Sequence, residues 1–130
     1  MYKGVITANT AVAANTNVPF VTVFNTNDNT GSTSAGVVDI KKAGFYDVVA
    51  NIRVTGVASS PITAQLYANG VAVPEAIATA EITATTGIAT LTIVDVLRVV
   101  RSDTGIANIS VRLAGAATVT NAVLTVEKRK

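Results

Sequence analysis

The segment AGFYDVVANIRVTG, residues 43–56, restricts the fold of this chain more than any other stretch. It is long, its polarity alternates from residue to residue, and it contains no start or stop signal of a helix. Successive side chains of a β-strand point to opposite faces of the sheet. One parity of the segment is entirely apolar, and its members are Tyr46, Val48, Ala50, Ile52 and Val54. This alternation predicts a long β-strand whose apolar side faces a core.

The other parity of the same segment predicts a face that is only partly exposed to solvent. It carries four polar side chains, Asp47, Asn51, Arg53 and Thr55, together with two large apolar ones, Phe45 and Val49. A purely solvated face has no need of the two apolar residues. We therefore expect one strand of a sandwich whose outer side touches another part of the chain or another copy of it.

The segment Ile88 to Val100, IATLTIVDVLRVV, is apolar on both parities. A strand that is apolar on both faces is covered on both faces. In a two-sheet sandwich only one face meets the core, so the second face is expected to meet a neighbouring subunit. The residues that we assign to this contact on the two segments are Phe45, Val49, Arg53, Val94, Val96 and Arg98.

The charged residues of the two segments have two interpretations. Asp47 with Arg53, and Asp95 with Arg98, are either exposed charges, each pair contributing at most about 1 kcal/mol, or ion pairs between subunits. Pairs of the second kind specify partners more than they stabilise the fold. The sequence leaves both interpretations open.

The composition favours a surface that is buried against partners. Only 14% of the residues are charged, where soluble domains average about 25%, while 49% are hydrophobic and 5% aromatic. Either the surface is unusually neutral or part of it is covered. We favour the second explanation because the two-faced strands indicate it independently.

The sequence gives no support to an enzyme. It contains no histidine and no cysteine, which removes the commonest general base and the thiolate metal sites. The eight acidic residues form no motif, and no phosphate loop or serine-nucleophile motif is present. Asp28 is the only carboxylate of the polar loop Asn25 to Ser34, where calcium loops carry several. We expect no catalytic residue, no metal site and no cofactor.

Neither nucleic acid nor a membrane is an expected partner. The ten basic residues are scattered apart from Lys128, Arg129 and Lys130, which are interpreted as a solvated tail. No run of about 20 apolar residues is long enough to span a bilayer. The first 20 residues lack the continuous apolar stretch of a signal peptide. We expect synthesis in the cytoplasm and no signal-directed export.

Turn signals divide the remaining chain into short strands. Asn69-Gly70 is the strongest hairpin signal, and Pro74 is expected to interrupt the returning strand. Glu75 to Ala84 has helical propensity, but its alternation favours a strand. The further strands are expected at Val5 to Ala8, Val18 to Phe24, Gly36 to Ile40, Ile62 to Ala68, Ile106 to Leu113 and Thr118 to Lys128. Nine or ten strands without a helix predict an all-β sandwich or barrel, as one domain over residues 1–130.

Three segments together resemble the C1q/TNF-like jelly-roll family: AGFYDVVANIRVTG, LRVVRSDTGIANISVRL and NAVLTVEK. The positions that carry the resemblance are Ala43, Gly44, Tyr46, Leu97, Val99, Asp103, Ile109, Val111 and Leu113. Ser102 stands where the family often has glycine. The resemblance implies a two-sheet antiparallel jelly-roll sandwich that assembles as a homotrimer. The LYANGVAVPEA hairpin and the Ala/Thr/Val/Asn-rich style are similar to the bacterial and bacteriophage branches, which include head-decoration, head-fibre and spore-surface proteins.

These expectations lead to two functional hypotheses. The first is a homotrimeric decoration protein, of head-fibre or cementing type, on the surface of a bacteriophage virion, with capsid proteins as partners. The alternative is a trimeric adhesin or receptor- or glycan-binding tip on a phage or spore, using the loops Asn25 to Ser34 and Val57 to Ser60.

The N-terminal segment, residues 1–17, is low in charge and is a candidate attachment segment that adds a strand to a capsid protein. Its proposed contact residues are Tyr2, Lys3, Val5 and Ile6. The competing interpretation is that the segment forms the first strand of the jelly roll.

Overall fold

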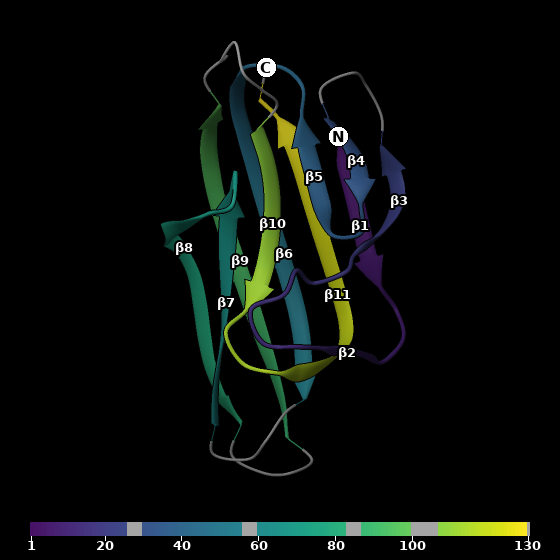
Figure 1. Ribbon diagram of the computed structural model, residues 1–130, viewed down its shortest axis with the longest axis vertical. Helices are drawn as coiled ribbons and strands as arrows, with labels where there is room; N and C mark the ends of the chain where they lie inside the picture. The colour runs from purple at the N-terminus through teal and green to yellow at the C-terminus, as the bar shows by residue number, and fades with distance from the viewer. Residues whose placement is uncertain (26–29, 56–59, 83–86, 100–106, 130) are drawn as a thin grey trace.

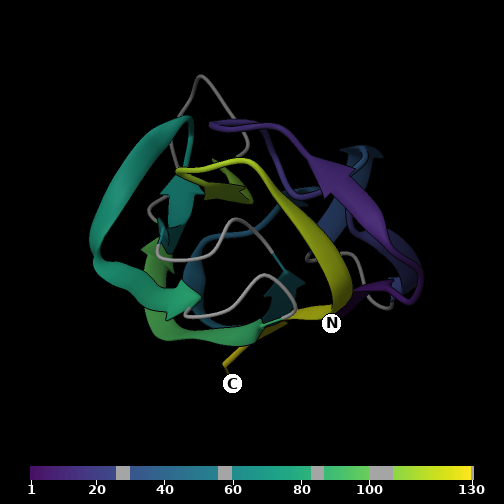
Figure 2. The same cartoon turned by 90° about the horizontal axis from the view of Figure 1, so that it is seen from below.

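The computed structural model describes residues 1–25, 30–55, 60–82, 87–99 and 107–129. Over these residues the chain forms eleven β-strands in two antiparallel sheets and no helix (Figure 1). Viewed from below, the two sheets curve around a shared interior (Figure 2). The prediction of an all-β sandwich is confirmed.

Sheet A contains the strands formed by the two long segments with which the sequence analysis began. Its strand order is β3 (Val21–Asn25), β1 (Tyr2–Ile6), β11 (Ala117–Lys128), β6 (Gly44–Thr55) and β9 (Ile88–Val99), with β2 (Thr10–Val12) also paired to β11. Sheet B has the order β4 (Thr30–Ser34), β5 (Val37–Ile40), β10 (Ala107–Leu113), β7 (Ser60–Ala68) and β8 (Val71–Ile82).

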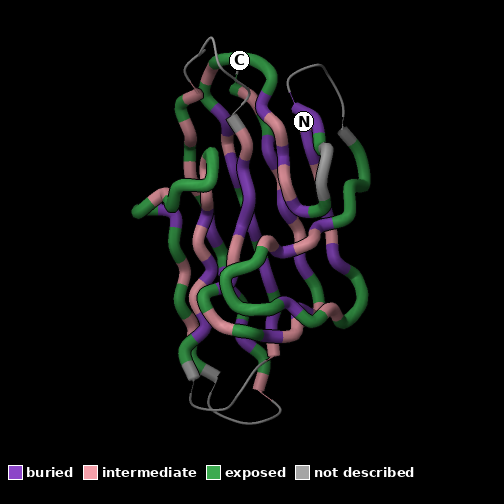
Figure 3. The backbone as a smooth tube through the Cα atoms, viewed as in Figure 1, coloured by how far each residue is buried: buried purple, intermediate pink, exposed green. Residues whose placement is uncertain are grey.

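The core lies between the two sheets and follows the predicted parities. On β6 every second side chain is buried, namely Tyr46, Val48, Ala50, Ile52 and Val54, as the alternation predicted. Neighbouring strands add Leu124 and Val126 from β11, Leu91 and Ile93 from β9, and Leu66 from the opposite sheet. Buried and exposed positions therefore alternate along the strands (Figure 3). Burial of these apolar side chains is the main source of stability.

The N-terminal segment contributes backbone contacts to both sheets, in line with the interpretation that it forms the first strand of the jelly roll. The first strand covers Tyr2–Ile6 rather than Val5 to Ala8, and it lies between β3 and β11, so both of its edges are paired. The chain then crosses to sheet B, where Asn15 N donates to Leu113 O at 2.7 Å and Val18 N donates to Val111 O at 2.8 Å. A strand with two paired edges has no free backbone edge to offer to a partner's sheet.

The segment that crosses between the sheets also explains why residue 36 is a glycine. Gly36 has a φ of 77°, and a Cβ atom there would lie 2.1 Å from the carbonyl oxygen of Val18. Only glycine combines that backbone angle with so close an approach.

The polar loop expected at Asn25 to Ser34 is partly a strand. Residues 30–34 form β4, in which Thr30 pairs with Ile40 and is buried. The expectation that this segment stays at the surface is wrong at Thr30, because pairing with β5 brings the strand onto the core. Asp28 lies outside the described residues.

The hairpin of β7 and β8 confirms one prediction and corrects another. Asn69 and Gly70 have φ values of 54° and 78°, as a turn with two left-handed residues requires. Pro74 does not end the strand, because β8 is the outermost strand of sheet B and tolerates a bulge there. The side-chain amide of Gln65 donates to the carbonyls of Val73 and Ala76 and holds this bulge. Residues 75–82 are strand, as the alternation predicted.

Candidate interaction face

The outer face of sheet A is the surface whose side chains point away from sheet B. Cross-strand partners lie on the same face of a sheet, so the register shows which side chains it brings together. Val49 of β6 lies opposite Val94 of β9, Asp47 lies opposite Val96, and Phe45 lies opposite Arg98. The sequence analysis assigned residues of both strands to one contact, and the register places them side by side.

Four of these side chains form an exposed apolar group. The exposed fractions are 53% for Phe45, 39% for Val49, 69% for Val94 and 39% for Val96. They come from two adjacent strands and face the same way, with Asp47 and Arg98 beside them, and together we call them the apolar patch. A patch of this kind on a chain with few charges is typical of a contact surface.

The apolar surface continues across the sheet through residues that the sequence analysis did not assign. Val21 of β3 lies opposite Val5 of β1, which lies opposite Val123 of β11, and Phe24 lies opposite Lys3. Val21 and Phe24 are exposed, and Val5 and Val123 are half-buried. Alternation assigns Val21 to one side of its strand. Only the register shows that this side is the face that also carries Val49 and Val94.

The charges on this face include one ion pair within the subunit. The single Nε–H of Arg129 is shared by both carboxylate oxygens of Asp47, at 2.9 and 3.1 Å, and no hydrogen bond joins Arg53 to Asp47. Arg129 is therefore tied to sheet A, which corrects its assignment to a solvated tail. Arg53 has no carboxylate partner among the described residues.

The charged residues Asp95 and Arg98 lie on opposite faces of β9. Arg98 lies on the outer face, whereas Asp95 has the parity of the buried residues Leu91 and Ile93. Asp95 Oδ1 accepts a hydrogen bond from Val96 N at 2.8 Å, and its Oδ2 is buried with no partner in the described part of the chain. Asp95 and Arg98 therefore do not face one another within the subunit, and their interpretation as ion pairs between subunits stays a prediction.

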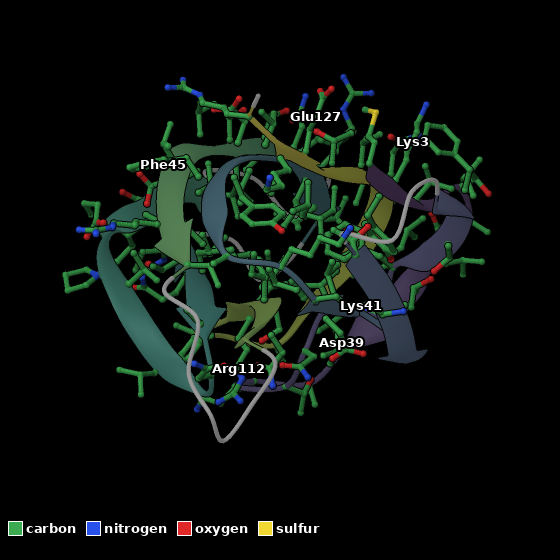
Figure 4. The ribbon with its side chains drawn as sticks, turned by 90° about the horizontal axis from the view of Figure 1, so that it is seen from above. Lys3, Asp39, Lys41, Phe45, Arg112 and Glu127 are labelled. Carbon is green, nitrogen blue, oxygen red and sulfur yellow. The ribbon has the colours of Figure 1, made fainter. Side chains whose placement is uncertain are left out.

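The four residues assigned to capsid attachment do not form one surface. Tyr2 and Ile6 are buried in the core, while Lys3 and Val5 lie on the outer face of sheet A. Figure 4 shows Lys3 and Glu127 projecting from this face, and Asp39 and Arg112 from the opposite side. Tyr2 and Ile6 are therefore corrected from contact residues to core residues.

One hollow of about 270 Å³ opens on the same outer face. Its lining residues come from three adjacent strands and are Asn51, Arg53, Thr90, Asn121 and Val123. Arg53 lies between Thr90 and Asn121 in the register. The hollow is polar, in contrast to the apolar patch, which lies toward the other end of the strands.

The outer face of sheet B differs from that of sheet A. Arg112 stacks over the ring of Tyr67, with its guanidinium carbon 4.3 Å from the ring centre, and donates to Asn17 Oδ1 at 3.0 Å. On this face β8 contributes the exposed apolar residue Ile77, which lies opposite Gln65.

Two kinds of site are not found in the described residues. No three His, Cys, Asp or Glu side chains of that part of the chain lie close enough to hold a metal ion. No helix within the described ranges is long and apolar enough to cross a membrane.

Comparison with known proteins identifies the fold. No protein-family model matches the sequence, and no curated protein matches it. The globular domain of zebrafish complement 1qA protein has a TM-score of 0.77 at 11% identity, with 99% of this chain and 96% of that chain covered. Eiger TNF from S. frugiperda has a TM-score of 0.71 at 11% identity, covering 99% and 95%. PRD1 vertex protein P5 has a TM-score of 0.62 at 14% identity, covering 99% and 96%. These likenesses show a C1q/TNF-like jelly roll.

Proposed function

We propose that this protein is a structural subunit of a bacteriophage virion, which assembles as a homotrimer through the outer face of sheet A and decorates the capsid. The observation that carries the proposal is the apolar patch of Phe45, Val49, Val94 and Val96, exposed on one face of a chain with few charges. In an isolated subunit this patch would lie in water.

The free energy available from this patch is large enough to matter. The exposed fractions of the four side chains together amount to about two complete side chains. At about 2 kcal/mol for each large apolar side chain, burying them stabilises the assembly by about 4 kcal/mol per subunit. The same surface extends over Val5, Val21 and Val123. Burial of the full interface therefore stabilises the assembly by more than this value.

The number three and the location on a particle rest on similarity. The C1q/TNF-like resemblance implies a homotrimer, and the fold supports that resemblance. A protein with this fold carries the name vertex protein, which fits a role on a particle surface. Capsid proteins are the proposed partners, the virion surface is the proposed location, and the host cytoplasm is the site of synthesis. The proposal includes no catalytic activity.

We place attachment to the capsid away from the N-terminal segment. Tyr2 and Ile6 fill the core, and β1 has no free edge. If the outer face of sheet A is used between subunits, the ends of the sandwich and the outer face of sheet B remain for docking.

The test combines particle binding with a mass measurement. Light scattering coupled to gel filtration should give three times the mass of one chain at micromolar concentration. The purified protein should then bind empty capsids at a fixed copy number and co-purify with virions. A trimer that binds glycans or cells but no capsid would instead support the adhesin, and a stable monomer would contradict the assembly.

A further inference from the structure

The hollow on the outer face of sheet A is built around one positive charge. Arg53 projects from β6, and its partners on the two neighbouring strands are Thr90 and Asn121. Asn51 lies two residues away on the same face and contributes to the wall of the hollow. All four side chains can donate hydrogen bonds, through a guanidinium, a hydroxyl and two amide groups.

A β-bulge in β11 shapes one wall of the hollow. The register between β11 and β6 shifts between Val119 and Asn121, so Thr120 is an extra residue. Thr120 Oγ1 donates to the carbonyl oxygen of Arg53 at 3.2 Å, which ties the bulge to the strand beside it. Val119 and Ala122 are buried, whereas Asn121 is exposed beside Arg53. Bulges of this kind re-aim side chains and are frequent at functional sites.

No carboxylate of the described residues balances the charge of Arg53. The acidic residues on this face, Asp47 and Glu127, are cross-strand partners near the other end of the sheet, and Asp47 is already bound by Arg129. Asp47 is six residues from Arg53 along an extended strand, which places them roughly 20 Å apart. Segments 56–59 and 83–86, which follow β6 and precede β9, contain no charged residue.

We propose that this hollow binds an oxyanion of the phosphate type. The planar guanidinium of Arg53 matches two oxygens of such an anion, and the amides and hydroxyl beside it can reach others. Its volume of about 270 Å³ exceeds what one such anion requires, so ordered water completes the shell.

The anion also has a consequence for assembly, which rests on the proposed function. In a cyclic trimer, the same residue of each subunit lies at the same height along the symmetry axis. Arg53 would then enter an interface whose neighbouring surface carries no carboxylate at that level among the described residues. A buried charge without a counter-ion destabilises strongly, and a bound anion removes that penalty.

The experiment is a phosphate titration of the full chain, against chloride at equal ionic strength, followed by calorimetry and by ³¹P NMR. Arg53→Gln should weaken phosphate binding by about tenfold or more, because charge-assisted hydrogen bonds are lost. Arg53→Lys keeps the charge without the planar fork and should bind with intermediate affinity. Arg129→Gln is the matched control: it removes one positive charge that Asp47 already balances. It should bind phosphate as the wild type does.

Measuring the mass of the protein in the same samples tests the anion site and the proposed trimer independently of one another. Saturable binding that depends on Arg53 supports the site, whether the protein is a trimer or a monomer. A wild-type protein that binds no phosphate, or an Arg53→Gln variant that binds it unchanged, overturns the site even when the protein is a trimer. A monomer that binds phosphate keeps the site and rejects the trimer.

Discussion

Replacement of Val94 by glutamate separates folding from assembly. Val94 is 69% exposed in the single subunit, so the glutamate side chain can stay in water there. We expect the stability of the subunit to change by about 1 kcal/mol or less, the range of strand propensities. In the trimer the same carboxylate would be buried without a partner.

The effect on assembly follows from two contributions. At about 2 kcal/mol for complete burial of a valine side chain, Val94 contributes about 1.4 kcal/mol per copy to the interface. An unpaired carboxylate adds a penalty that we take, conservatively, as about 2 kcal/mol. For three copies the loss is about 10 kcal/mol, or roughly seven orders of magnitude in the association constant. Since that constant for a trimer scales with the square of concentration, half-dissociation moves to a concentration roughly three to four orders of magnitude higher.

The assay is sedimentation velocity of the wild type, Val94→Glu and Ile77→Glu at micromolar concentration, with circular dichroism as a check of folding. Ile77 is 50% exposed on sheet B and receives the same kind of charge, so its variant should remain a trimer. Dissociation of Val94→Glu alone supports the assigned face. A Val94→Glu variant that is as trimeric as the wild type would show that subunits do not meet through Val94.

Three further predictions concern the fold and its charges. Burial raises the pKa of Tyr46 above its ordinary value of 10.0, so the stability from its neutral form is complete below pH 10 and is lost as pH rises through the folded-state pKa. Urea unfolding between pH 8 and 11 should therefore show a shallower alkaline loss for Tyr46→Phe, and equal slopes would contradict this. The bond from Arg129 to Asp47 is exposed, so a double-mutant cycle should give about 0.2–1 kcal/mol, decreasing with salt. Deletion of residues 1–10 removes β1 from the middle of sheet A and should abolish the folded domain by circular dichroism, whereas a folded truncated protein would show that this strand is dispensable.

The sequence predicted the parts of the fold that depend on local alternation. The buried side of β6 and the two-sided apolar character of β9 follow from the period of two, because a strand cannot hide consecutive side chains on one face. The turn at Asn69 and Gly70 follows from the backbone angles that these two residues tolerate. In each case the signal lies within a few neighbouring residues.

The parts that the sequence did not predict depend on long-range register. Thr30 reads as part of a polar loop until β5 pairs with it and covers its side chain. Asp47 could be expected beside any nearby cation, and only the path of the chain after β11 brings Arg129 to it. The hollow around Arg53 needs the extra residue Thr120 in the neighbouring strand, and a single bulge has no reliable signature in the sequence.

The pairing of β1 with β11 determines when, during synthesis and folding, the outer face of sheet A can be complete. Tyr2 lies opposite Val126, so the middle of sheet A closes only after the ribosome has released nearly all of these residues. Contacts of such high sequence separation form late and slow folding. The outer face of sheet A is assembled from β1, β3, β6, β9 and β11, and therefore no nascent fragment presents it complete. If subunits associate through this face, as we propose, they can do so only once each has finished folding, and nascent chains would then be kept from associating prematurely.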